Sequence, residues 1–172
     1  MAMASAGAAP VVAPDVASRV AQAGTPVDGL EINFRRDPTI YDGRFANNGW
    51  LQELPKPMTK LVWDNAALIA PATAEQHGLH NNDLIAISRG HLSEPMRVPV
   101  WIIPGHAKDS ITISVGYGRT RAGNLGNGTG FDAYQLRDSG SMFFGQAAMT
   151  TTGDSYELAN TQDHWSIEHT NS

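Results

Sequence analysis

The sequence predicts one small, mainly β domain with short helices, because turn-forming residues are frequent and apolar runs are short. Its 172 residues include 17 glycines and 10 prolines, which indicates many turns and few long helices. Three runs rich in Val and Ile, residues 84–88, 98–103 and 111–115, lie between such turns and have the length of strands. A chain of this size can bury about 68–70% of its unfolded surface. A barrel or sandwich with its own core therefore fits the pattern.

The first part of the chain is expected to be a flexible segment, residues 1–27, followed by a strand and a wrapping loop, residues 28–58. Within the flexible segment, residues 16–23 have the pattern of a short helix that ends at Gly24. Residues 30–34 alternate apolar and polar side chains, which is the period of a half-buried strand. The rest of the second segment is rich in Gly, Asn and Pro and predicts an extended loop.

Residues 59–145 are expected to form a barrel, and residues 146–172 a polar C-terminal tail. In the barrel region, residues 61–63 predict a short strand. Residues 71–78 predict a short helix, because Pro stands at its first turn and Gly just past its end. Residues 81–83 predict a turn, since Asn tolerates positive φ. The three Val- and Ile-rich strands described above complete this region.

Composition and charge exclude several classes of protein. The net charge of −5 argues against general nucleic-acid binding, which relies on clustered Lys and Arg. The chain has no cysteine, so it holds no disulfide, no thiolate-bound iron–sulfur cluster and no Cys-type zinc site. No apolar run approaches the ~20 residues that span a bilayer. Residues 1–14 are rich in Ala without a basic start, and we do not interpret them as a signal peptide.

A glycine-rich loop at residues 116–130 is the strongest local feature with possible chemistry. Closely spaced glycines let backbone N–H groups approach a phosphate, and Arg119 and Arg121 can add charge-assisted contacts. The loop lacks the Gly-Lys-Ser/Thr of a P-loop, and no helical pattern follows as a dinucleotide-binding fingerprint requires. On spacing alone, a surface loop whose glycines permit its turns is the favoured interpretation.

The spacing of the His and Asp residues gives little support for a metal site or a catalytic pair. His77 and His80 stand three apart, but Gly78 is expected to end the helix between them, so they do not share a helix face. Asp163 next to His164 resembles a catalytic pair only in sequence. The sequence therefore predicts no metal site and no autonomous catalytic site. The four tryptophans are expected to be core or interface anchors.

Several short motifs together resemble a known family. The strings AEQHGL (residues 74–79), DLIAISRG (83–90), VPVWIIPG (98–105) and ITISVG (111–116) follow the order of the C-terminal domain of the molybdopterin oxidoreductases. That family's domain is a double-psi β-barrel that helps to bind the dinucleotide arms of the cofactor. The resemblance therefore implies a double-psi β-barrel-like domain with extended wrapping loops. Asn82 stands where the family usually has Gly, and Asn also reaches positive φ.

The flanking motifs resemble one branch of this family, the large iron–sulfur subunit of alternative complex III. They are NGWLQELP (48–55), PMTKLVWDN (57–65), GYGR (116–119), GTGFDAY (128–134) and ANTQDHW (159–165). The resemblance covers residues 28–168. In that branch this domain precedes a cluster-bearing part, so we expect the chain to be a fragment, a split-gene product or a truncated reading frame.

The resemblance implies a structural module of a membrane-associated, quinol-oxidising electron-transfer complex. It implies no cofactor in this chain, and partners among the other domains and subunits of a respiratory complex, including iron–sulfur and cytochrome c subunits. It also implies a place at the outer, periplasmic face of a bacterial cytoplasmic membrane. The apolar residues expected at the interface are Trp50, Leu51, Leu54, Phe143 and Phe144.

Two alternatives stay open. The first is a true molybdopterin guanine dinucleotide-binding domain of a molybdenum oxidoreductase. Its cofactor-binding residues would be Asn65, Gly116, Gly118, Arg119, Arg121, Gly126 and Gly128. The second is a free-standing barrel without a redox role, since one fold hosts many functions.

Overall fold

The computed structural model describes residues 12–23 and 29–162. Expectations for residues 1–14 lie largely outside this range, and those for Gly24, Asp163, His164 and Trp165 lie wholly outside it. The helix α1 (Val16–Ala23) has the bounds that the sequence predicts. No helix among the described residues is long and apolar enough to cross a membrane.

Within the described residues, seven strands form one mixed sheet in the order β6-β1-β5-β2-β4-β3-β7. The strands are β1 (Glu31–Arg36), β2 (Ala67–Ile69), β3 (Asp83–Ser88), β4 (Met96–Ile102), β5 (Ser110–Val115), β6 (Phe144–Gln146) and β7 (Ala148–Ser155). The pairs β1–β5 and β2–β4 are parallel, and the other neighbours are antiparallel. The predicted mainly β class with few short helices is confirmed.

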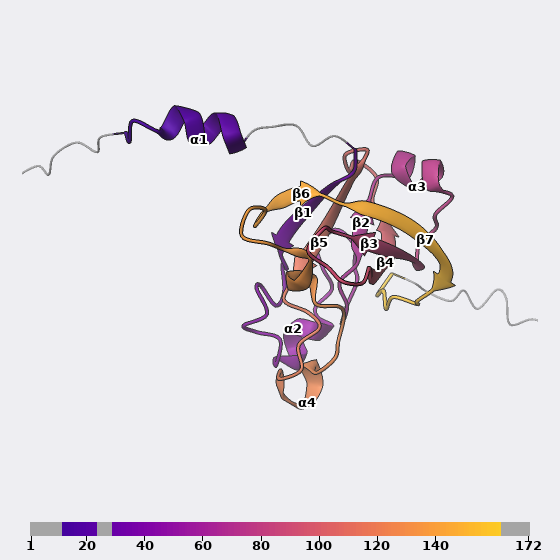
Figure 1. The fold of residues 1–172 in the computed structure, drawn as a ribbon. Helices are drawn as coiled ribbons and strands as arrows, with labels where there is room; N and C mark the ends of the chain where they lie inside the picture. Colours follow the sequence, from indigo (N-terminus) through magenta and orange to yellow (C-terminus); the bar gives the residue numbers. More distant parts are fainter. Residues whose placement is uncertain (1–11, 24–28, 163–172) are drawn as a thin grey trace, which may run out of the picture.

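The two edges of this sheet are consecutive pieces of one chain segment (Figure 1). β6 pairs with β1, and β7 pairs with β3, while only Ala147 separates β6 from β7. The Ala147 N–H donates to the Leu30 carbonyl at 3.1 Å, so this junction is itself tied to the start of β1. The sheet therefore curls into a barrel-like shape, and residues 144–155 form its closing segment.

The core follows the period of two that strands impose on side chains. In β1 the buried residues are Ile32 and Phe34, and in β3 they are Ile85 and Ile87. β5 contributes Ile111, Ile113 and Val115, and β4 contributes Val98 and Val100, so the inside of the curled sheet is filled by branched apolar side chains.

The helix α3 (Pro71–His77) has the ends that its sequence predicts. Pro71 stands in the first turn, where a missing N–H leaves nothing unpaired. Gly78 adopts φ 64°, and its N–H donates back to the carbonyls of Ala74 and Glu75. The predicted turn after the helix is also present, with Asn82 at φ 75°.

Two expectations about strands are wrong. Residues 61–63 do not form a strand, because Trp63 turns to φ 65° and Leu61 makes only an isolated bridge with Asn160. The strand of this region, β2, begins at Ala67. The polar tail expected at residues 146–172 is wrong for residues 148–155, because they form β7, which pairs along β3 and leaves most of its side chains exposed.

Opposite α3, a lobe projects from the barrel (Figure 1). We define this α2–α4 lobe as residues 37–58 and 116–130. It contains the short helices α2 (Gly49–Glu53) and α4 (Gly123–Gly126), which contact each other. Ile40, Ala46, Tyr117 and Ala122 form its small core, with Leu51 packed against them. The predicted wrapping loop thus folds onto the glycine-rich loop.

Candidate functional site

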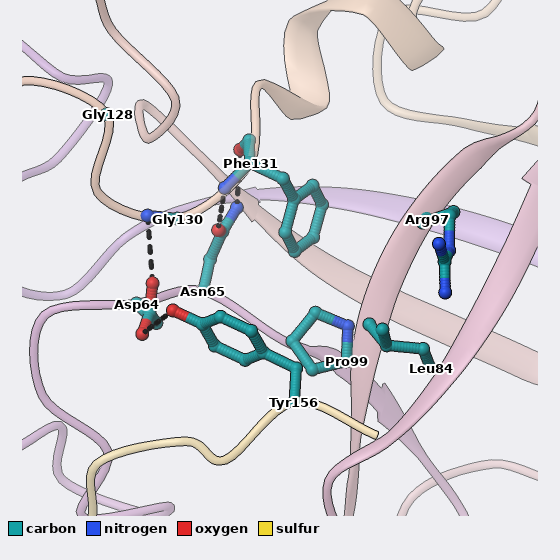
Figure 2. A pocket seen from close by; sticks show the side chains of 9 residues that line it. All are labelled: Asp64, Asn65, Leu84, Arg97, Pro99, Gly128, Gly130, Phe131 and Tyr156. Carbon is teal, nitrogen blue, oxygen red and sulfur yellow. Dashed lines mark hydrogen bonds between the residues drawn. The ribbon is translucent and has the colours of Figure 1, made fainter. Parts of the chain in front are cut away.

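A pocket of about 320 Å³ opens where the end of the glycine-rich loop meets β3, β4 and the segment after β7 (Figure 2). We call it the Asp64 pocket. Its lining residues are Asp64, Asn65, Leu84, Arg97, Pro99, Gly128, Gly130, Phe131 and Tyr156.

Asp64 is the most confined ionisable group of this pocket, with an exposed fraction of 7%. The Gly130 N–H donates to its Oδ1 at 2.8 Å, and the Tyr156 hydroxyl donates to its Oδ2 at 3.0 Å (Figure 2). Burial raises the pKa of Asp64, although these two hydrogen bonds act in the opposite direction. Asp64 therefore links the glycine-rich loop, at Gly130, and the segment after β7, at Tyr156, to one side of the pocket.

The side-chain amide of Asn65 forms hydrogen bonds with backbone groups of this protein. Its Nδ2 donates to the carbonyls of Ser114 at 2.8 Å and Phe131 at 3.1 Å, and its Oδ1 accepts from the Phe131 N–H at 2.9 Å. The residue is 1% exposed. It joins the end of β5 to the loop before the 3₁₀ helix η1 (Ala133–Leu136), and these contacts occupy both of its amide hydrogens.

Three predicted cofactor-binding glycines lie where the glycine-rich loop packs against other backbone. A Cβ at Gly116 would stand 2.4 Å from the Gly43 nitrogen, and a Cβ at Gly118 would stand 2.3 Å from the Asp132 nitrogen. At Gly126 it would stand 2.1 Å from the Ala46 carbonyl oxygen. The missing side chains thus allow close internal packing.

The remaining predicted cofactor-binding residues separate into two places. Gly128 lines the Asp64 pocket, adopts φ 72° and has open space where a Cβ would point. Arg119 and Arg121 are exposed and belong to the α2–α4 lobe, outside that pocket. The structure therefore brings Asn65 and Gly128 together but not the two arginines with them.

A second and larger pocket, of about 530 Å³, was not predicted. We call it the arginine pocket. It is lined by Phe34, Arg35, Arg36, Asp42, Val115, Tyr134, Arg137, Met142 and Phe143. The Nε of Arg137 is buried without a hydrogen-bond partner, which leaves a donor unsatisfied at this pocket. The adjacent Arg35 and Arg36 stand out in the sequence, whereas Arg137 lies a hundred residues away.

Beside the lobe core lies a charged cluster of Asp37, Lys56 and Tyr117. The Lys56 Nζ donates to the Tyr117 hydroxyl at 2.9 Å and lies 3.9 Å from the Asp37 Oδ2. That Oδ2 has no hydrogen-bond partner, while Oδ1 accepts from the N–H groups of Thr39 and Ile40. Burial lowers the pKa of Lys56 and raises that of Tyr117.

The lining of the Asp64 pocket combines hydrogen-bonding groups with an apolar wall. Among the described residues that line the Asp64 pocket there is no Ser, Cys or His to act as nucleophile or base. Arg97 pairs with Asp154 at its edge, and Leu84, Pro99 and Phe131 form an apolar wall. No group of three or more His, Asp or Glu in the described part of the chain could hold a metal ion.

Among solved structures, acetylene hydratase from Pelobacter acetylenicus is similar to this chain, with a TM-score of 0.53 and 13% sequence identity. The match covers 80% of this chain and 20% of acetylene hydratase, so the chain spans only a small part of that protein's length. At this identity the likeness shows that the chain shares the fold of one part of acetylene hydratase. No protein-family model and no curated protein sequence matches the chain.

Proposed function

We propose that this chain is a structural domain of a larger electron-transfer subunit, in a membrane-associated, quinol-oxidising complex that resembles alternative complex III. The observation that carries the proposal is the closed form of the glycine-rich loop. A Cβ added to any of three glycines of this loop would stand within 2.4 Å of a backbone atom of another segment. These glycines are Gly116, Gly118 and Gly126. A loop of this form stabilises the protein and offers no open cradle for phosphate.

Asp64 and Asn65, two polar residues that line the Asp64 pocket, support the same proposal. Asn65 makes three internal hydrogen bonds, and the Asp64 carboxylate accepts two. A ligand would have to replace these bonds, and leaving buried partners unpaired costs about 1–3 kcal/mol each. The domain thus fits a scaffold that positions the cluster-bearing and cytochrome c parts of a complex at the outer face of a bacterial membrane.

Cofactor content tests this proposal. The protein is purified from a host that makes molybdopterin guanine dinucleotide, and its pterin and molybdenum are measured against protein concentration. Thermal unfolding in parallel establishes that the sample is folded. We expect a folded protein with neither pterin nor molybdenum, and stoichiometric pterin would contradict the scaffold function.

The arginine pocket favours a second candidate, binding of the cofactor's dinucleotide part. Arg35, Arg36 and Arg137 line this pocket with only one acidic residue, Asp42, and the Asp42 carboxylate is already paired with Arg44 at 2.6 Å. Guanidinium groups bind phosphate through charge-assisted hydrogen bonds. The unpartnered Nε of Arg137 is one donor that an anion would satisfy.

Guanosine diphosphate is the probe that separates the two candidates, with titration calorimetry as the measurement. If the arginine pocket binds it, Arg35→Gln with Arg137→Gln should weaken binding at least tenfold, while Arg119→Ala with Arg121→Ala should leave it unchanged. The opposite pattern would assign binding to the glycine-rich loop. No heat of binding in the unchanged protein leaves the scaffold function as the better supported one.

A further inference from the structure

The α2–α4 lobe presents large apolar side chains that nothing in the described structure covers. Trp50 is 85% exposed, Leu125 57% and Leu54 51%, and Phe45 is also exposed. These four residues come from two segments that lie together, since a Cβ on Gly49 would stand 2.7 Å from the Leu125 Cδ1. An exposed cluster of this kind marks an interaction surface.

The charges around this surface differ from those of the molecule as a whole. Arg119 and Arg121 lie on the segment that leads into α4, and both are exposed. Neither guanidinium group makes a hydrogen bond or ion pair with another described residue, while the Arg119 carbonyl accepts from the Gly128 N–H at 2.9 Å. Arg44 is in the same lobe, with its charge partly neutralised by Asp42. The lobe holds four basic residues (Arg44, Lys56, Arg119 and Arg121) and three acidic ones (Asp37, Asp42 and Glu53), a net charge of +1, whereas the whole chain carries −5.

A protein partner fits these observations better than a membrane. An anionic bilayer is a broad plane that meets the field of the whole molecule, and a net charge of −5 opposes that approach. α2 has five residues, which is too short for a helix that lies in the lipid interface.

We propose that the α2–α4 lobe docks into a protein partner that has an apolar socket rimmed by Asp and Glu side chains. Trp50 is the anchor in the socket, because a large, rigid aromatic side chain at the centre contributes most to binding. Arg119 and Arg121 pair with the acidic rim and fix the orientation. This deepens the proposed scaffold function, since it assigns the surface by which the domain is held.

Site-specific photo-cross-linking in cells of the native host tests the docking. A benzophenone amino acid replaces Trp50 in the full chain, and a matched variant carries it at Gln76, an exposed position in α3 on the opposite end of the barrel. After irradiation, mass spectrometry identifies the adduct and the cross-linked peptide. We expect one protein adduct at position 50, with Asp or Glu beside an apolar contact, and none of it at position 76.

Charge reversal gives the decisive control. Arg121→Glu, alone and with Arg119→Glu, should reduce the adduct at position 50 at least tenfold, and Lys108→Glu should leave it unchanged. Because Arg119 packs beside Gly43, the single Arg121 variant keeps the test valid if the double variant is unstable. Reversal of the partner's identified acid to Arg should restore the adduct.

Three results would overturn the proposal: a lipid adduct at position 50, an adduct with a second copy of this chain, or equal yields at positions 50 and 76. Pterin content is independent of all three. A protein that binds pterin and still gives the acidic-partner adduct would refute the scaffold function alone, and a pterin-free protein without the adduct would refute the docking alone.

Discussion

At the residue scale, Lys56 supplies the positive charge that faces the buried Asp37 carboxylate. Its ammonium is the nearest cation to the Asp37 Oδ2, which has no hydrogen-bond partner, and both side chains are buried. A buried pair of this kind adds little net stability when intact, but loss of one member leaves an uncompensated charge.

Lys56→Met should therefore lower the free energy of unfolding by about 3–5 kcal/mol, the usual effect of breaking a buried pair. Urea unfolding followed by far-UV circular dichroism measures it. Lys108→Met is the matched control, since the Lys108 side chain is 59% exposed and its change should stay within about 0.5 kcal/mol. Equal effects of the two substitutions would show that the charged cluster does not stabilise the lobe.

Asp64 gives stability a defined pH dependence. Burial places its pKa in the folded protein above the unfolded value of 3.8, so the folded state binds the proton more tightly. As pH rises from 3.8 through the raised pKa, the carboxyl becomes charged in its buried place and the folded state loses stability relative to the unfolded state.

Lys56 affects stability at alkaline pH. Its pKa in the folded protein is lowered from 10.5, so the free energy of unfolding rises with pH between the lowered pKa and 10.5.

Asp64→Asn keeps the shape of the side chain and removes its titration. The free energy of unfolding of the unchanged protein minus that of Asp64→Asn should fall between pH 4 and pH 7, as far as about 1.4 kcal/mol for each pKa unit. Urea unfolding at several pH values gives this difference. A difference that stays flat, or rises, over the range would mean that burial does not raise the Asp64 pKa.

Asn65 illustrates what the sequence predicts at this scale and what it does not. The resemblance to the molybdopterin oxidoreductases suggests a binding residue at this position, yet its amide bonds to Ser114 and Phe131, about fifty and sixty-six positions further along the chain. Such pairings depend on which strands become neighbours. The same holds for Arg137, whose place beside Arg35 and Arg36 follows from the fold and not from spacing.

At the element scale, the glycine-rich loop predicts a difference between two of its glycines. A Cβ on Gly126 meets the Ala46 carbonyl oxygen, while a Cβ on Gly128 meets open space but has a positive φ of 72°. Gly126→Ala should lower stability by about 2–3 kcal/mol, as overpacking does, and Gly128→Ala by about 1 kcal/mol from backbone strain. Thermal unfolding of both variants measures this, and a larger loss at Gly128 would contradict the closed form of the loop.

Elements with local signals were predicted, and those without them were not. α3 has Pro at its start and Gly at its end, and β3, β4 and β5 are runs of branched residues, so chemistry within each segment identifies them. β2 is only three residues long, and nothing in its apolar string separates it from its neighbours. β7 has no buried residue and so lacks an apolar alternation in its sequence, and it becomes a strand through its pairing with β3.

At the scale of the whole molecule, closure of the sheet depends on the junction at Ala147. Ala147→Pro removes the N–H that donates to Leu30 and should loosen β6 and β7 together. Hydrogen exchange of the amides in β7 should then be at least tenfold faster, while Ala147→Ser, which keeps the N–H, should leave it near the original rate. Unchanged protection of β7 in the Pro variant would show that the two strands are held independently.

The closing segment also sets the order of events on the ribosome. Residues 144–155 follow the other strands of the described sheet in the sequence, so β1 and β3 leave the exit tunnel with one side of each unpaired. An unpaired edge is a template for another chain. In the described sheet, the nascent chain therefore carries two unpaired strand edges, at β1 and β3, until β6 and β7 are synthesised.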